Sequence, residues 1–247
     1  MKQKPDRRSF LKNVSVAGVA GTLMPTEIIS ASENRAATTT NNNLKNATGR
    51  KYNDIYTGDY LNRVAFPLGG MGAGMFCIEG TGSISHMSIR NKPDIFNTPE
   101  VFAAISIKGL KNGAKLLEGP VPDWKKFGQR DAGNGSGGAT TGLPHFHHAR
   151  FKARFPFALI QLTDEELPIE VEITGWSPFI PTEDDNSSLP VAAIEYKIVN
   201  KGTSPVDAIF SFNAKNFVAV DDGKNSINKT ANGFILSEAG TKEKPFL

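Results

Sequence analysis

The sequence predicts an all-β protein, folded as an antiparallel β-sandwich. The first indication is alternation: apolar residues occupy every second position of Ile169–Trp176, as in a strand with one buried face. The same pattern runs through Val101–Lys108 and Val191–Asn200. Finally, 24 glycines and 15 prolines supply the many turns that short strands require, whereas helical periodicity is scarce.

Residues 1–32 resemble an export signal of the twin-arginine type. The residues that carry this motif are Arg7, Arg8, Phe10, Leu11 and Lys12. A mildly apolar stretch and small residues near position 32 follow, as in a segment that a peptidase removes. The segment therefore predicts export to the periplasm or beyond, and the alternative is a basic amphipathic helix that stays attached.

Residues 33–53 are polar and low in complexity, so we expect a disordered linker before a folded domain at 54–247. Residues 1–32 hold five of the 28 basic residues and two of the 25 acidic ones, so the remainder carries 23 of each. This balance gives no basic surface for a nucleic-acid partner. Since no apolar run approaches about 18 residues, we expect no transmembrane segment in the mature chain.

Along the domain, strand-like runs alternate with turns. The runs are Arg63–Leu68, Met75–Ile78, Ser83–Ile89, Val101–Lys108, Lys115–Leu117, Ala149–Thr163, Ile169–Trp176, Val191–Asn200, Val206–Asn213, Phe217–Val220 and Gly233–Ser237. We expect loops at Arg90–Pro99 and Pro120–Pro144. We also expect a hairpin in which Val206–Asn213 returns from Val191–Asn200 through a turn where Gly202 adopts positive φ.

Ala149–Thr163 reads as a bent strand or a pair of strands, with a bulge or a sheet edge at Pro156. Phe151, Phe155 and Phe157 alternate with other residues, and we expect them in the core. The single cysteine, Cys77, excludes an internal disulfide and is expected to be a small buried hydrophobe.

Two patterns suggest ligand sites at first sight. Gly70, Gly72 and Gly74 are spaced as in a dinucleotide-binding loop, but a strand-like run follows them instead of the helix that such a loop needs. His145 and His147 would share one face of a strand, as zinc ligands do, but no cysteine or carboxylate lies close by in sequence. We therefore expect loop histidines, no metal and no cofactor.

Three segments carry a resemblance to a known family: PLGGMGAGMF at 67–76, RFPFALIQL at 154–162, and WSPFIP at 176–181 with SSLP at 187–190. In this order they resemble the N-terminal domain of family 116 glycoside hydrolases, which include the non-lysosomal β-glucosylceramidase. The resemblance implies a sandwich of the supersandwich type, then an (α/α)6 barrel that holds the catalytic carboxylates. On this reading 54–247 is an N-terminal domain, incomplete at its C-terminus, with no catalytic residue.

The resemblance also implies partners and a site. The partners would be the protein's own C-terminal catalytic domain and a carbohydrate or glycolipid substrate. The candidates for contact with that domain or for the rim of its cleft are Gly69, Gly70, Gly72, Gly74, Trp176, Phe179 and Ile180. None of the acidic residues Glu170, Glu172, Asp184, Asp185 and Glu195 has the setting of a glycosidase acid or nucleophile. Two alternatives remain, a carbohydrate-binding module that uses Trp124 or Trp176 and a structural β-domain.

Overall fold

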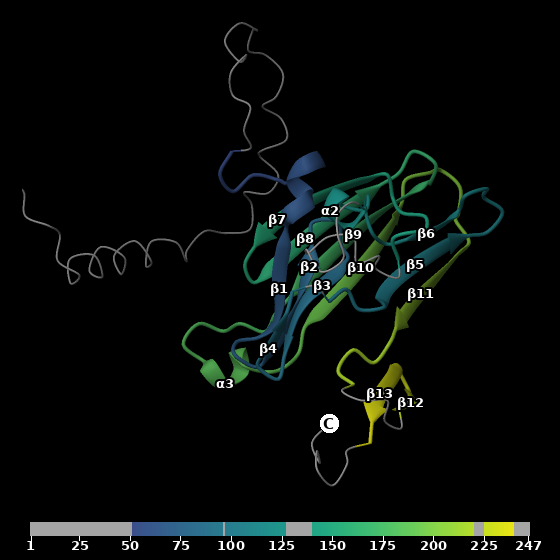
Figure 1. Ribbon diagram of the computed structural model, residues 1–247. Coiled ribbons are helices and arrows are strands. Elements are labelled where there is room, and N and C mark those ends of the chain that lie inside the picture. The colour runs from purple at the N-terminus through teal and green to yellow at the C-terminus, as the bar shows by residue number, and fades with distance from the viewer. Residues whose placement is uncertain (1–50, 96, 127–139, 220–224, 240–247) are drawn as a thin grey trace, which may run out of the picture. The chain divides into compact units, whose positions relative to one another are not determined.

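A computed structural model of the chain describes residues 51–95, 97–126, 140–219 and 225–239 (Figure 1). These residues all belong to one compact unit, which spans Arg50–Leu247. Antiparallel strands dominate it and its helices are short, so the prediction of an all-β fold is confirmed. The export signal and residues 33–50 lie outside the described residues, and what the sequence indicates for them stays a prediction.

The first sheet is a four-stranded meander in the order β1-β2-β3-β4. Its strands are β1 (Ala65–Gly70), β2 (Gly74–Glu79), β3 (Ile84–Ile89) and β4 (Lys92–Asp94). The prediction of a loop over Arg90–Pro99 is wrong where β4 pairs with β3. The reason is a two-residue turn at Arg90 and Asn91, whose φ angles of 54° and 55° suit the tight turn of a hairpin.

The second sheet has the order β10-β9-β8-β7. Its strands are β7 (His148–Arg154), β8 (Phe157–Thr163), β9 (Ile169–Trp176) and β10 (Ala193–Asn200). The strand predicted at Ile169–Trp176 is confirmed residue for residue. Arg154 pairs with Phe157, so Pro156 lies in the two-residue turn of a hairpin rather than at a bulge or a sheet edge.

The third sheet has the order β11-β5-β6, and a separate hairpin follows it. The strands are β5 (Val101–Ile107), β6 (Ala114–Leu116), β11 (Ala208–Ala214), β12 (Asn225–Thr230) and β13 (Gly233–Glu238). The hairpin expected between Val191–Asn200 and Val206–Asn213 is wrong, because β10 pairs with β9 whereas β11 pairs with β5.

The connection between β10 and β11 shows why that hairpin does not form. Asn200 accepts a hydrogen bond from the Gly202 backbone N–H through Oδ1 (2.9 Å) and donates one to the Ser204 carbonyl through Nδ2 (2.8 Å). These bonds hold a wider loop, and Gly202 does not adopt the predicted positive φ. The strand expected at Phe217–Val220 is also wrong over its described part, since Phe217–Ala219 contains none.

In the described part of the chain, three short helical segments lie in the connections. They are η2 (Gly58–Arg63), a 3-10 helix, and the α-helices α2 (Asp123–Lys126) and α3 (Asp184–Ser187). The first two lie before β1 and inside the predicted loop Pro120–Pro144, of which residues 127–139 are not described. Among the described residues, no helix has the length and apolar character needed to cross a membrane.

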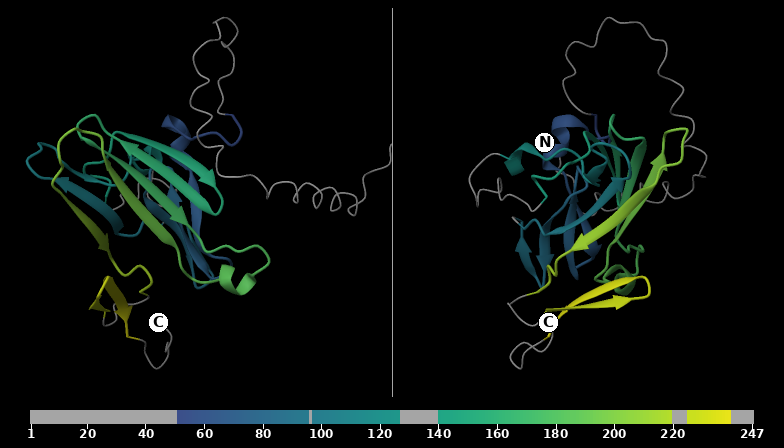
Figure 2. Two further views of the ribbon diagram at one scale, coloured as in Figure 1. Left: turned by 180° about the vertical axis from the view of Figure 1, so that it is seen from behind. Right: turned by 90° about the vertical axis from the view of Figure 1, so that its right-hand side faces the viewer.

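The core lies where the sheets face one another, which makes the arrangement a sandwich (Figures 1 and 2). Alternate residues of β9 point into this core, and the residues between them point outward, as the sequence predicted. A Cβ on Gly175 would lie 2.8 Å from the Leu68 side chain of β1, so the two sheets approach closely at this glycine. The buried apolar residues of this core include Leu68, Ile78, Ala103, Ile105, Phe151, Ile160, Leu162, Val171 and Ile173.

The single cysteine is buried in β2, as predicted. Burial raises the pKa of the Cys77 thiol, and the nearby charge of Glu79 raises it further. A thiol with a raised pKa has little thiolate at neutral pH, so Cys77 is unsuited to nucleophilic chemistry.

Candidate functional site

The glycine segment forms the tight turn between β1 and β2. Gly69, Gly72 and Gly74 have φ angles of 144°, 73° and 108°, which L-residues with a side chain rarely adopt. Gly70 has an ordinary φ, but a Cβ there would lie 2.2 Å from the carbonyl oxygen of Leu189. The four glycines are therefore needed for two different reasons, backbone conformation and close approach.

The segment from Trp176 to Pro190 packs against this glycine turn. Ser177, at the end of β9, accepts a hydrogen bond from the Gly69 backbone N–H through Oγ (3.0 Å). At the other end of the segment, the Ser187 carbonyl accepts a hydrogen bond from the Met71 backbone N–H (2.8 Å). Two sequence motifs that lie far apart in the chain are thus joined by one backbone–side chain and one backbone–backbone hydrogen bond.

Ser187 gives the loop around Ile180 its shape. Its buried Oγ accepts a hydrogen bond from the Ile180 backbone N–H (3.0 Å) and contacts the Ile180 carbonyl at 3.1 Å. These contacts close the loop between Ile180 and Ser187, the last residue of α3, and the Ile180 side chain remains exposed. Thr182, with a φ angle of 73°, lies at the bend.

The third motif reaches the same end of the sandwich through the turn between β7 and β8. Phe155 packs edge-on against Phe179, with 4.9 Å between the ring centroids. Phe157 lies directly opposite Trp176 in the pairing of β8 with β9. The expectation that Phe155 and Phe157 belong to the core is wrong, because they are 61% and 44% exposed, whereas Phe151 is buried.

The reason for that error is the turn at Pro156. Alternation along one strand would place all three phenylalanines on one face, but the chain reverses between Phe155 and Phe157. On β8 the core face belongs to Ala158, Ile160 and Leu162, so Phe157 points to the opposite face.

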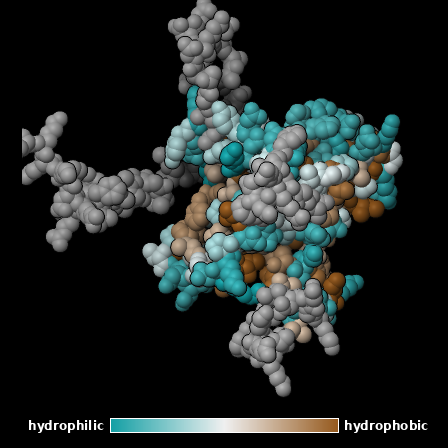
Figure 3. Space-filling view, in the orientation of Figure 1, coloured by the Kyte–Doolittle hydropathy of each residue, from teal (hydrophilic) through white to brown (hydrophobic). Residues whose placement is uncertain are grey.

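The three motifs thus form one continuous area, which we name the motif surface. Its exposed apolar side chains are Met71, Phe155, Phe157, Trp176, Ile180 and Leu189. Figure 3 shows that hydrophobic residues reach the surface of the described domain among hydrophilic ones. Side chains of this kind make packing contacts and stack on flat apolar groups, and none of them can donate or accept a proton in catalysis.

Two of the acidic residues that the sequence singled out, Glu170 and Glu172, lie beside lysines. Glu172 forms an ion pair with Lys197 of the adjacent strand (2.8 Å), and Glu170 lies 3.6 Å from Lys201. The pKa of Lys197 is raised, mainly because it donates a hydrogen bond to Glu172. These carboxylates belong to cross-strand ion pairs on the outer face of a sheet.

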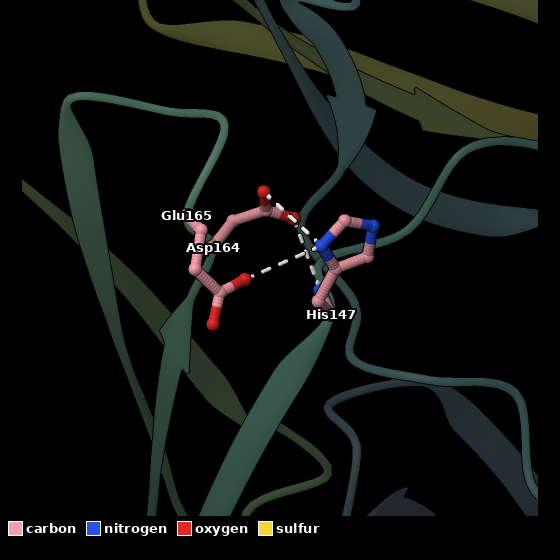
Figure 4. A group of neighbouring side chains, drawn as sticks. All are labelled: His147, Asp164 and Glu165. Atoms are coloured by element: carbon pink, nitrogen blue, oxygen red, sulfur yellow. Dashed lines mark hydrogen bonds and ion pairs between the residues drawn. The ribbon is translucent and has the colours of Figure 1, made fainter.

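The histidines lie at the opposite end of β8. His145 and His147 do not act together: His145 Nε2 lies 3.4 Å from Glu118, whereas His147 Nδ1 lies 3.4 Å from both Asp164 and Glu165 (Figure 4). The sequence analysis missed these two carboxylates. Since His148 pairs with Thr163, the next residues of the β8–β9 turn necessarily lie beside His147, and counting back along this hairpin would have found them.

Asp164 is held in place by a buried ion pair. Lys115 Nζ lies 2.6 Å from Asp164 Oδ2 and 3.1 Å from Glu166, with the Lys115 and Asp164 side chains 3% and 0% exposed. Burial disfavours both charges, but the hydrogen bonds between them outweigh it. They raise the pKa of Lys115 and, together with backbone N–H donors from Glu166 and His147, lower the pKa of Asp164.

Two cavities open beside these residues. One, of about 430 Å³, is lined by His147, His148 and residues of η2 and α2, and the other, of about 470 Å³, by Lys115, His145 and His147. His147 lines both of them. This part of the molecule, which we name the histidine end, therefore combines titratable groups with accessible space.

Comparison with known families identifies the domain. A family model described as beta-glucosidase 2, glycosyl-hydrolase family 116 N-term, matches residues 65–243. The match covers well over half of the chain, so the chain belongs to this family of N-terminal domains, and the resemblance drawn from the three motifs is confirmed. A search of curated proteins gave no match.

Proposed function

We propose that this chain is the non-catalytic N-terminal part of an exported glycoside hydrolase that acts on β-glucosides or glucosylceramide-like substrates. The observation that carries the proposal is the family match over residues 65–243, which describes the N-terminal portion of a glycosidase. The non-catalytic role is supported by the position of Glu170 and Glu172, which lie in ion pairs with lysines on a sheet rather than across a cleft.

Catalysis is tested by incubating the 247-residue chain with an aryl β-glucoside, and in parallel a longer protein that continues into the catalytic domain. We expect release of the aryl group by the longer protein only, because hydrolysis needs two carboxylates facing one sugar ring. Turnover by the 247-residue chain at the rate of the longer protein would refute the non-catalytic role.

We assign the motif surface to contact with the protein's own catalytic domain. Its side chains are apolar, they come from the three segments that carry the family resemblance, and hydrogen bonds to backbone N–H groups hold the segments together. A rigid apolar surface of this kind loses little entropy on docking. The domain would then brace the catalytic barrel and supply loops to the rim of its cleft.

This contact is tested in the longer protein with Ile180→Asp, compared with Leu143→Asp as the control. The two residues are equally exposed, at 45% and 44%, and Leu143 lies near the histidine end. We expect Ile180→Asp to lower the unfolding temperature of the catalytic domain and the rate of hydrolysis. Equal behaviour of the two variants would show that the motif surface is not the docking surface.

Export is a separate part of the proposal and rests on residues 1–32 alone. The pair Arg7 and Arg8, followed by Phe10, Leu11 and Lys12, supports a twin-arginine signal. Replacing both arginines with lysine should keep the positive charge but leave the protein inside the cell, as measured by fractionation. Unchanged export would point to a different signal.

A second function, binding of a carbohydrate by the domain itself, is favoured by one observation. Phe157 and Trp176 expose aromatic rings on neighbouring strands, Phe155 exposes one in the adjacent turn, and such rings stack on sugar faces. Binding of the chain to a glycan array, lost in Trp176→Ala, would support this function. Trp124 is less suitable, since its ring contacts His86 and Lys125.

A further inference from the structure

The histidine end brings nitrogen and oxygen ligand atoms together at one point. One ligand atom from each of His147, Asp164 and Glu165 lies within 4.8 Å of the other two (Figure 4). They come from the two connections that flank the β7–β8 hairpin, one before β7 and one after β8. The pairing of His148 with Thr163 sets their relative position, so the arrangement depends on a regular sheet rather than on a free loop.

The distances suit a small tetrahedral ion. Nδ1 of His147 lies 3.4 Å from Oδ1 of Asp164 and 3.4 Å from Oε2 of Glu165. Zinc binds nitrogen and oxygen at about 2.0–2.2 Å, so two ligands at a tetrahedral angle lie about 3.3–3.6 Å apart. Magnesium, at about 2.0–2.1 Å in octahedral geometry, would require about 2.9 Å between adjacent ligands, and calcium prefers oxygen ligands alone.

Each carboxylate is oriented by a partner on its other oxygen. Asp164 Oδ2 accepts hydrogen bonds from Lys115 Nζ (2.6 Å) and from the His147 backbone N–H (3.0 Å). Glu165 Oε1 lies 2.6 Å from His148 Nε2. Asp164 Oδ1 also accepts a hydrogen bond from the Glu166 backbone N–H (2.9 Å). Oδ1 and Glu165 Oε2 each lie 3.4 Å from His147 Nδ1, and hydrogen bonds of this kind to a carboxylate are typical of residues that bind metals.

The charge of the cluster also suits a divalent cation. Asp164, Glu165 and Glu166 are three consecutive carboxylates, and the cation in contact with two of them is Lys115. With neutral histidines, these four side chains carry two negative charges in excess. A divalent ion at His147 would neutralise them, and the adjacent cavities leave room for water as a further ligand.

We propose that His147, Asp164 and Glu165 bind one Zn²⁺ ion, or a divalent transition metal of similar size, through Nδ1, Oδ1 and Oε2. His148 and Lys115 orient the two carboxylates. The site lies apart from the motif surface and does not depend on the proposed function. The proposal departs from the sequence-based expectation of no metal, which rested on the absence of a nearby carboxylate in the linear sequence.

The proposal is tested by calorimetric titration of Zn²⁺ into the full chain, prepared without a polyhistidine tag and stripped with a chelator. We expect one Zn²⁺ per chain, an increase in unfolding temperature with Zn²⁺, and no binding of Mg²⁺ or Ca²⁺ at the same concentrations. Co²⁺ should bind with the strong visible absorption of tetrahedral cobalt. His147→Ala and Glu165→Gln should each weaken Zn²⁺ binding at least tenfold.

The controls separate a metal site from general attraction to acidic surfaces. Asp184→Asn removes one of two adjacent exposed carboxylates in α3, far along the chain from any histidine, and should bind Zn²⁺ as the native chain does. The variants at His147 and Glu165 change exposed side chains. Measuring their unfolding temperatures without metal is the control that tests whether they fold. The proposal is overturned if the native chain binds no Zn²⁺, or if both variants bind it with native affinity.

Discussion

At the scale of single residues, the buried ion pair of Lys115 and Asp164 should contribute strongly to the stability of the fold. Lys115→Met should lower the free energy of unfolding by about 3–5 kcal/mol, because it leaves the Asp164 carboxylate buried without its cation. Chemical denaturation of the purified chain measures this loss.

The double variant Lys115→Met/Asp164→Asn tests the reason for that loss. It removes both charges, but its single amide oxygen can accept only one of the two backbone hydrogen bonds that Asp164 accepts, from His147 at Oδ2 and from Glu166 at Oδ1. We expect it to be more stable than Lys115→Met alone. If the two substitutions are additive, the charges do not interact as the structure indicates.

Gly70 gives a second prediction at this scale. Gly70→Ala should destabilise the chain by about 1–3 kcal/mol, because the new Cβ would meet the backbone of Ser188 and Leu189, which cannot move aside as a side chain would. Gly142→Ala is the matched control, since nothing lies within 4 Å of its Cβ position. Similar denaturation midpoints for the two variants would contradict the close approach.

At the scale of the elements, the sequence predicted strands better than it predicted their pairing. Long alternating runs such as Ile169–Trp176 and Val101–Lys108 were found because one face of each is buried. The short strand β4 was missed because its turn uses positive φ at Arg90 and Asn91, neither of which is a glycine. The partner of β11 was missed because pairing with β5 is a long-range contact that no local pattern encodes.

The connection between β9 and the glycine turn gives an element-scale prediction. Ser177→Ala should destabilise the chain by about 1–3 kcal/mol, because it leaves the Gly69 backbone N–H without its acceptor in a largely buried position. Hydrogen exchange at Gly69 and Met71 should accelerate as the turn separates from the loop. The exposed Ser211→Ala is the control, and an equal, small effect of both variants would show that this hydrogen bond is unimportant.

The sequence predicted the segments that form the candidate site but not the contacts between them. The seven residues named from the motifs do lie in two segments that touch, but the contact between Gly70 and Leu189 emerges only from the fold. Phe155 and Phe157 were assigned to the core from alternation along one strand, but the chain turns at Phe155 and Pro156. Asp164 and Glu165 were missed because their closeness to His147 depends on strand register.

At the scale of the whole molecule, the described domain exposes an apolar strand at a sheet edge. β11 is the outer strand of its sheet and carries Ile209, Phe210 and Phe212, all exposed. Such an edge pairs readily with other chains. Ile209→Lys should therefore reduce concentration-dependent association of the 247-residue chain, as measured by light scattering.

The control for this prediction is Leu110→Lys, which adds the same charge at the turn after β5. It should leave association unchanged, because that position presents no unpaired strand. Equal association of the native chain and both variants would show that the chains do not associate through the edge strand β11.

β8 runs from the motif surface at Phe157 to the histidine end after Thr163, a span of about 20 Å for a seven-residue strand. A paramagnetic ion such as Mn²⁺ or Co²⁺, bound beside Thr163, would be a probe at a fixed position in the domain. Such an ion broadens NMR resonances, and the broadening falls steeply with distance from the ion. The broadening measured in an attached domain would therefore report the distance and orientation of that domain relative to this one.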